Sequence, residues 1–281
     1  MRRLGDRKDA VKIRNIDSMH YFMPVLFKDR SANEAFMAMD VELEAAEDFI
    51  SKYNEGKTEE DRLSLFGLII AAMLKTVCNR PQLNRFIKNK DIYQRTEVSA
   101  AFVVKKEFTD EGSENLARVD ADDNDTVFSI QKKLNAQITK CKTETDETTD
   151  AMNILQKFPI KGFIGALFRW LDKHGLIPQS IVATDPYQCS VVLTNLGSIG
   201  LSVGYHHLMN WGTNSIFVVV GKKEYKPFFD KNGNAKMKKV IKLSFTVDER
   251  ISDGYYFAKS FRLLKRYLEN PDLLAKSFNE Q

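Results

Sequence analysis

The chain from residue 190 onward constrains the fold most, because short apolar segments replace the longer amphipathic ones that precede them. Runs over residues 190–194, 214–220 and 239–247 are typical of β-strands. The stretch Asp230-Lys231-Asn232-Gly233 carries the Asn-Gly signal of a tight hairpin. Strands and helices are mixed without strict alternation, which predicts an α/β fold with a mixed sheet flanked by helices. It argues against a doubly wound nucleotide-binding fold.

The rest of the chain supplies helices and a few more strands. The clearest signal is the helical recurrence of Leu63, Phe66, Ile70, Leu74 and Val77, followed by Pro81 as a stop signal. The acidic stretch 107–125 is expected to be a solvated loop. By the same criteria we expect strands at residues 36–43 and within 83–106, and helices at residues 44–53, 63–78, 126–141, 152–171 (interrupted by Pro159) and 255–269.

Composition sets bounds on the organisation of the chain. With 281 residues, 43% hydrophobic and 28% charged, it is an ordinary globular sequence. We expect a wrapping segment over residues 1–34 and one core domain over residues 35–281, with no linker or small domain ahead of it. The net charge of +4 argues neither for nor against nucleic acid, but no base-reading or zinc-finger pattern occurs, so no nucleic-acid partner is expected.

Compartment follows from cysteine usage and from the N-terminus. Three scattered cysteines make a disulfide framework improbable and fit a reducing cytoplasm. The basic N-terminus lacks the apolar region of a signal peptide, and no run of 18 apolar residues could span a membrane. We therefore expect a cytoplasmic protein.

A cluster of charges follows the last strand, in Phe245-Thr246-Val247-Asp248-Glu249-Arg250-Ile251-Ser252-Asp253-Gly254. Function is often mounted where a buried strand ends. Glu249 and Asp253 are four positions apart around a turn and could flank one cleft. The alternative is a polar turn in which Asp253 caps the following helix.

A second candidate is Leu193-Thr194-Asn195-Leu196-Gly197, in which a strand delivers a hydroxyl, an amide and a glycine turn. Such a turn can direct the Thr194 hydroxyl toward a developing oxyanion. The alternative is a plain turn without a chemical role.

The third candidate is the pair His206 and His207, half of the four histidines in the chain. A metal site would need a further ligand, and no matching spacing of Cys, His or Asp is evident, so no metal is expected. The alternative is a histidine pair in the core or on the surface.

Taken in order, these segments resemble the last third of a dihydrolipoyl acyltransferase core of the 2-oxo acid dehydrogenase complexes. That family reads Ser-Asn-Leu-Gly, an apolar strand ending in Gly, Asp-His-Arg-x-x-Asp-Gly, and a closing Leu-Glu-Asn-Pro helix. The chain is also similar to chloramphenicol acetyltransferase through Asn79-Arg80-Pro81 and Phe158-Pro159-x-Lys161-Gly162-Phe163-Ile164. The matching segments here are Thr194-Asn195-Leu196-Gly197, Ile216-Phe217-Val218-Val219-Val220-Gly221, Asp248-Glu249-Arg250-x-x-Asp253-Gly254 and Leu268-Glu269-Asn270-Pro271.

The resemblance implies a trimer with an active-site channel between subunits, entered by coenzyme A from one end and the acyl acceptor from the other. In the family the motif histidine deprotonates the acceptor, a Ser or Thr hydroxyl stabilises the oxyanion, and the motif Asp orients the site through an arginine. By resemblance Thr194 is the oxyanion hydroxyl, Asp253 the orienting carboxylate and Arg14 its arginine. Asn195, Gly197 and Gly254 would line the substrate site.

The histidine position holds Glu249, which leaves two interpretations open. In the first, the protein transfers an acyl group from acyl-CoA to a thiol or hydroxyl, with Glu249, His206 or His207 as general base. The two-unit difference between a free Glu and a free His would cost roughly tenfold in rate at a Brønsted slope of about 0.5. In the second, a pseudoenzyme binds acyl-CoA or a protein partner without turnover.

Assembly and surface contacts complete the expectations. The sequence has no lipoyl or subunit-binding domain, and its tail after Leu274 is polar, so we expect a free homotrimer. The apolar stretch 154–170 could lie on a membrane surface, although packing against its own fold is the expected role. The lysine-rich hairpin around residues 222–242 could attract the phosphates of coenzyme A, although a solvated hairpin is expected.

Overall fold

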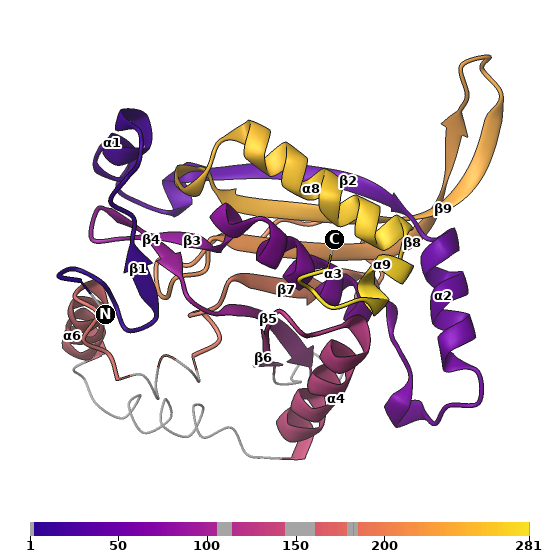
Figure 1. The fold of residues 1–281 in the computed structure, drawn as a ribbon, viewed down its shortest axis with the longest axis horizontal. Coiled ribbons are helices and arrows are strands. Elements are labelled where there is room, and N and C mark those ends of the chain that lie inside the picture. The colour runs from indigo at the N-terminus through magenta and orange to yellow at the C-terminus, as the bar shows by residue number, and fades with distance from the viewer. Residues whose placement is uncertain (1–2, 106–113, 144–160, 179–181, 183–184, 281) are drawn as a thin grey trace.

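The structure is a computed structural model, and it describes residues 3–105, 114–143, 161–178, 182 and 185–280 (Figure 1). Its centre is a six-stranded sheet in the order β2-β9-β8-β7-β5-β6. A small sheet in the order β1-β4-β3 lies beside it. The strands are β1 (Ala10–Lys12), β2 (Glu34–Glu42), β3 (Arg85–Lys88), β4 (Asp91–Arg95), β5 (Val98–Lys105), β6 (Glu114–Ala121), β7 (Val191–Asn195), β8 (Ile216–Phe229) and β9 (Ala235–Asp248).

The large sheet is mixed, as predicted. β7 runs parallel to both of its neighbours, β5 and β8, whereas the other pairings are antiparallel. The helices are α1 (Ser18–Leu26), α2 (Glu44–Asn54), α3 (Leu65–Asn79), α4 (Val127–Thr143), α6 (Lys161–Lys173), α8 (Gly254–Glu269) and α9 (Asp272–Ala275). The predicted α/β class is therefore confirmed.

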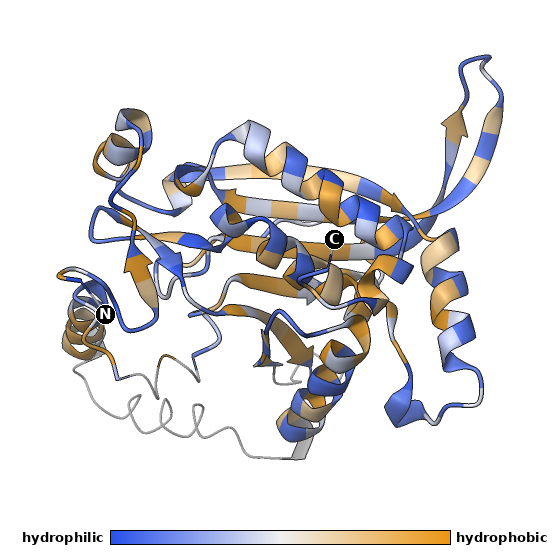
Figure 2. Ribbon diagram, in the orientation of Figure 1, coloured by the Kyte–Doolittle hydropathy of each residue, from blue (hydrophilic) through white to orange (hydrophobic). Residues whose placement is uncertain are grey.

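One face of the large sheet is covered by α3 and α8, which lie in front of the strands in Figure 1. Ser64 caps α3 by accepting a hydrogen bond from the Gly67 amide at 2.9 Å. The helix is buried over most of its length, so its apolar residues surround it instead of forming one stripe. Figure 2 shows the apolar residues gathered in this helix and in the strands behind it. We call this covered side of the sheet the helix face.

A buried lysine fixes the C-terminal tail to the helix face. Lys75, in the middle of α3, is 1% exposed and donates to the carbonyls of Leu273 at 2.7 Å and Ser277 at 3.0 Å. Burial lowers the pKa of its ammonium group. These carbonyls, one in α9 and one after it, replace the water that Lys75 would otherwise need, so the tail closes over the core.

The hairpin predicted at Asn232-Gly233 is confirmed, with longer strands than expected. β8 and β9 pair over most of their length, and Gly233 has the positive φ of 84° that the turn requires. The tip projects beyond the sheet (Figure 1). Its lysines meet carboxylates of neighbouring elements: Lys226 pairs with Asp40 at 2.8 Å and Lys238 with Glu42 at 2.7 Å.

The prediction of a solvated loop over residues 107–125 is wrong for residues 114–121, which form β6. β6 pairs antiparallel with β5, from Val98 opposite Ala121 to Lys105 opposite Glu114. Ala117 and Val119 are buried, while Arg118 pairs with Asp120 at 2.8 Å. Alternation with period two makes a half-buried edge strand, and it outweighs the acidic composition. Residues 107–113 lie outside the described residues.

The expectation that the apolar stretch 154–170 packs against its own fold fails for the part that the structure describes. Residues 154–160 lie outside the described residues. The remainder belongs to α6, and Phe163 and Trp170 in it are more than half exposed. No helix among the described residues is long and apolar enough to cross a bilayer.

Candidate active site

The other face of the large sheet carries the residues that the sequence singled out. Successive side chains along a strand point to opposite faces of the sheet. One set packs in the core with α3 and α8. The residues that point the other way are Glu34 and Phe36 of β2, Thr246 of β9, Phe217 of β8 and Thr194 of β7. Residues 196–214, which join β7 to β8, lie against this side. We call it the loop face.

The connection 196–214 runs back along β8. The Lys222 amide donates to the Leu201 carbonyl at 2.8 Å, and the His206 ring stacks on Phe217 with 4.7 Å between centroids. β7 and β8 are parallel, so the chain must return along the sheet before it can enter β8. That return places the histidines on the loop face.

Thr194 sits near the end of β7, 8% exposed. The next residues build the turn that follows it. The Asn195 carboxamide accepts a hydrogen bond from the Ser198 amide at 3.3 Å. A Cβ at Gly197 would lie 2.5 Å from the Gly221 carbonyl oxygen, so only glycine fits there. Asn195 and Gly197 thus position Thr194 through the backbone.

The charged turn after β9 splits into buried and exposed parts. Asp248 and Arg250 form a buried ion pair at 2.7 Å, and Arg250 also donates to the Phe27 carbonyl at 2.9 Å. Asp253 accepts a hydrogen bond from the Tyr256 amide at 2.7 Å and so caps α8, which begins at Gly254. The capping interpretation of Asp253 is confirmed. Glu249 is exposed beside the buried pair.

Arg14, chosen as the partner of Asp253, pairs instead with Asp6, at 2.8 Å, and donates to the carbonyls of Leu4 and Lys12. It therefore braces the N-terminal segment. An arginine that does reach a carboxylate of the motif turn is Arg30, whose Nε lies 3.8 Å from Asp248 Oδ2. Burial lowers the Arg30 pKa, and the charge of Asp248 opposes that shift. Arg30 belongs to no recognisable sequence motif, so sequence reasoning missed it.

His207 is held by a carboxylate that sequence reasoning also missed. Its Nδ1 lies 2.9 Å from Glu34 Oε2, and the Leu208 amide donates to Glu34 Oε1 at 2.6 Å. The Glu34 side chain is 3% exposed, whereas that of His207 is 86% exposed. A buried carboxylate thus fixes one ring nitrogen while most of the imidazole faces outward. Glu34 opens β2 opposite Asp248, so His207 lies at the Glu249 end of the loop face.

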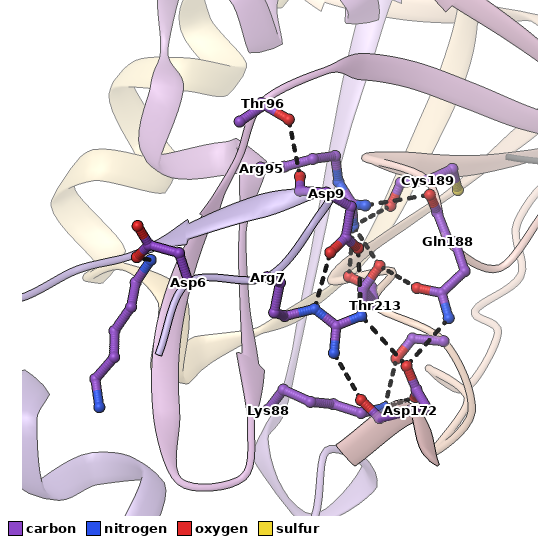
Figure 3. A network of polar contacts seen from close by, with 12 residues as sticks. Asp6, Arg7, Asp9, Lys88, Arg95, Thr96, Asp172, Gln188, Cys189 and Thr213 are labelled. Carbon is purple, nitrogen blue, oxygen red and sulfur yellow. Dashed lines mark hydrogen bonds and ion pairs between the residues drawn. The ribbon is translucent and has the colours of Figure 1, made fainter. Parts of the chain in front are cut away.

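Arg95 links the segment before β7 to the end of the connection that carries the histidines (Figure 3). It is buried and donates to the carbonyls of Gln188 at 3.1 Å and Cys189 at 3.0 Å, just before β7. The same guanidinium donates to the Thr213 hydroxyl at 2.5 Å, just before β8. Burial lowers the pKa of Arg95 to about 10, so it stays charged at neutral pH.

Other chemistries find little support at this face. The part of the chain that the structure describes contains no group of His, Cys, Asp and Glu suited to a metal ion. None of the three cysteines forms a disulfide, and burial raises the pKa of Cys78 and of Cys189 to about 11. Neither of these two is a thiolate nucleophile at neutral pH. A hydroxyl, an exposed histidine and carboxylates remain, which suits proton transfer and oxyanion stabilisation.

Comparison with known proteins agrees with this inventory. The family model of the 2-oxoacid dehydrogenases acyltransferase (catalytic domain) matches residues 180–276, which include Thr194, both histidines and the charged turn. No curated protein matches the chain by sequence.

Several solved structures share the fold. A probable dihydrolipoamide acetyltransferase from Listeria monocytogenes superposes with a TM-score of 0.61 at 14% identity, covering 92% of this chain and 94% of its own. The Azotobacter vinelandii dihydrolipoamide acetyltransferase gives 0.61 at 13% identity, with 94% of both chains covered. A chloramphenicol acetyltransferase gives 0.53 at 14% identity, covering 92% of this chain and 99% of its own.

The resemblance stated from the motifs is therefore confirmed. The chain carries a match to the acyltransferase catalytic domain of 2-oxoacid dehydrogenases over residues 180–276, on the fold shared by dihydrolipoamide acetyltransferase cores and chloramphenicol acetyltransferase.

Proposed function

We propose that the protein is a CoA-dependent acyltransferase, that its active site forms between subunits of a homotrimer, and that His207 is its general base. The acyl group passes from acyl-CoA to a thiol or hydroxyl acceptor. The observation that carries the proposal is the 2.9 Å contact between His207 Nδ1 and the buried Glu34 carboxylate. It supplies an oriented base at the end of the sheet where the family motif has lost its histidine.

Strand register supports a site shared between subunits. Thr194 pairs with Val219, and Val219 pairs with Ser244, whereas Glu249 lies five positions further along the chain from Ser244. At about 3.3 Å per residue and about 4.8 Å between strands, Thr194 and Glu249 are roughly 15–20 Å apart in one chain. His207 lies at the Glu249 end. The hydroxyl of one subunit can meet the base of another if two loop faces come together.

The loop face has the apolar character that such an assembly needs. Phe36 and Tyr205 contact each other with 5.3 Å between ring centroids and remain about half exposed. Exposed Ile199, Leu201 and Val203 extend the patch along the connection 196–214. Contiguous apolar surface of this kind marks an interface. We infer that the patch is buried between copies of the chain.

The proposed reaction balances with the groups present. A hydrogen bond from Nδ1–H to Glu34 leaves Nε2 of His207 as the acceptor, and Nε2 takes the proton from the thiol or hydroxyl of the acceptor. The resulting sulfur or oxygen attacks the thioester carbonyl, and the Thr194 hydroxyl of a neighbouring subunit donates to the oxyanion. The intermediate collapses with cleavage of the bond between the carbonyl carbon and the CoA sulfur. The released CoA thiolate takes the proton that His207 removed from the acceptor. Glu34 stabilises the transient imidazolium.

Release of free CoA from a series of acyl-CoAs, with and without thiol acceptors, tests the proposal. His207→Gln should lower kcat by about 10²–10⁴, the usual contribution of a general base. Glu34→Gln should lower kcat less and leave KM for acyl-CoA unchanged. The matched control is His206→Gln, which removes the adjacent exposed imidazole. If Glu249→Gln loses the activity and His207→Gln keeps it, the base is Glu249.

Subunit mixing tests the shared site. Thr194→Val and His207→Gln chains, each inactive alone, should regain activity when mixed, up to about a quarter of wild type in randomly assembled trimers. No recovery in confirmed mixed trimers would place the site within one chain. Sedimentation should show a free trimer, which Phe36→Asp dissociates and Tyr225→Asp, on the exposed hairpin, does not. A wild-type monomer or a large cubic particle would contradict the assembly.

The substitution at Glu249 favours one other function, a pseudoenzyme that binds acyl-CoA or a protein partner. Calorimetric binding of a non-hydrolysable acyl-CoA analogue separates the two. If the wild type binds the analogue but neither it nor any of the variants releases CoA, the pseudoenzyme is supported and the enzymatic proposal is overturned.

A further inference from the structure

Helix α6 is firmly anchored at one end. Asp172, in its last turn, is fully buried and forms an ion pair with Lys88 of β3 (Figure 3). Arg7 donates to the Asp172 carbonyl at 2.7 Å and also approaches its carboxylate, at 3.4 Å. Arg7 is in turn held by Asp9 at 2.9 Å. Buried ion pairs require good geometry to offset their desolvation, so α6 has a defined orientation on the molecule.

The outward side of α6 is apolar. Phe163 is 70% exposed, Leu167 44% and Trp170 53%, and their spacing of four and three residues places them on one stripe of the helix. Its other side meets the fold through Asp172 and through Phe168, whose ring centroid lies 6.5 Å from that of Trp211. Figure 2 shows both apolar and hydrophilic residues on this helix. A stripe of three large exposed side chains marks an interaction surface.

The charge around the stripe is positive. Arg169 and Lys173 are exposed and lie four residues apart on α6, beside the stripe. The helix has one acidic residue, Asp172, and it is buried in ion pairs. The apolar stripe is therefore flanked by cations without exposed acids on the helix to balance them.

We propose that α6 is a peripheral membrane-binding helix that lies flat on an anionic lipid surface. Phe163, Leu167 and Trp170 would enter the boundary between headgroups and acyl chains, while Arg169 and Lys173 contact lipid phosphates. The helix is about 20 Å long, shorter than the roughly 30 Å hydrocarbon core, so it rests on the bilayer. A second copy of the same positive surface would be repelled, and charge complementarity selects an anionic partner. The proposal does not depend on acyl transfer.

Flotation with lipid vesicles tests the proposal on the full chain. The wild type should float with vesicles of phosphatidylcholine and phosphatidylglycerol. With vesicles of phosphatidylcholine alone it should remain in the bottom, unbound fraction. The double variant Phe163→Ser/Leu167→Ser should reduce vesicle binding at least tenfold. Arg169→Glu/Lys173→Glu should do the same, and added salt should weaken wild-type binding. The matched control is Phe229→Ser, which removes an aromatic ring of equal exposure, 69%, from the hairpin tip.

Trp170 provides a readout that reports on the helix itself. Its fluorescence should shift to shorter wavelength when anionic vesicles are added, and the shift should disappear in Trp170→Phe, which keeps Trp211. Absence of wild-type binding, equal binding to neutral vesicles, or unchanged binding in both α6 double variants would each overturn the proposal. So would a loss of oligomeric state in Phe163→Ser/Leu167→Ser, because it would show that another copy covers the stripe.

Discussion

The two faces of the large sheet differ in the polar groups that their buried residues carry. On the helix face Leu193, Val218 and Phe245 are buried against α3 and α8 in one apolar core. On the loop face β9 carries Ser244 and Thr246, whose buried hydroxyls find no partner among the described residues. A face that only had to be stable would not retain such groups, because each costs free energy when buried unpaired. The apolar core therefore lies on one side of the sheet, and the residues proposed for chemistry lie on the other.

The largest expected effect tests the helix face. Phe245 is fully buried and stacks on Phe261 with 4.1 Å between centroids. Phe245→Ala should lower the free energy of unfolding by about 3–5 kcal/mol, because it removes apolar contacts and leaves a cavity. Urea denaturation measures the loss, and kcat per folded molecule should be unchanged. A loss below about 1 kcal/mol would contradict the view that the helix face supplies the stability of the fold.

Thr194→Val tests the loop face with a side chain of similar shape. The oxyanion role predicts that kcat falls about 10²–10³-fold, equivalent to about 2.7–4 kcal/mol in the barrier. The midpoint of urea denaturation should stay close to that of the wild type. Thr246→Val, the same change on β9 of the same face, is the control and should retain activity. Equal losses in both variants would show that the loop face responds to packing and not to the hydroxyl of Thr194.

Ser244→Ala has a smaller expected effect, and its sign carries the information. The Ser244 hydroxyl is buried without a partner among the described residues, so its removal should stabilise the fold by about 1 kcal/mol. Differential scanning calorimetry measures the change in Tm. A destabilised variant would mean that the assembled protein supplies the missing partner.

The smallest effect concerns acid stability at the anchor of α6. Burial raises the pKa of Asp9, but hydrogen bonding and the charge of Arg7 outweigh it and lower the pKa below its usual 3.8. The folded pKa lies below the unfolded one, so this stabilisation is present at neutral pH and is lost as pH falls through the folded pKa. Asp9→Asn should therefore flatten the decline of stability below about pH 4. Urea titrations at several pH values check this, and an unchanged acid slope would contradict it.

Much of the fold was predictable because local patterns and tertiary packing agree in it. The helical recurrence through Leu74 predicted α3, and Asn232-Gly233 predicted the hairpin between β8 and β9. Where composition and periodicity disagreed, in β6, periodicity prevailed because half of that strand is buried. The mixture of strands and helices without strict alternation predicted the mixed sheet that the structure has.

The site was predictable in part. Sequence alone offered Thr194, His207 and the charged turn as candidates, and of its two interpretations of Asp253 the helix cap is the one that the structure has. It could not find Glu34 or Arg30, because each acts on residues far away in the chain and belongs to no local pattern. For the same reason it assigned Arg14 to the wrong carboxylate.

The sequence by itself determined which groups are available: a strand-end hydroxyl, two adjacent histidines, a charged turn that contains Glu249, and the elements that carry them. Tertiary structure alone decided their neighbours. Strand register separates Thr194 from Glu249, and a parallel crossing carries His207 back to Glu34. Periodicity and propensity act over a few residues, whereas burial and ion pairing depend on contacts between residues distant in the chain.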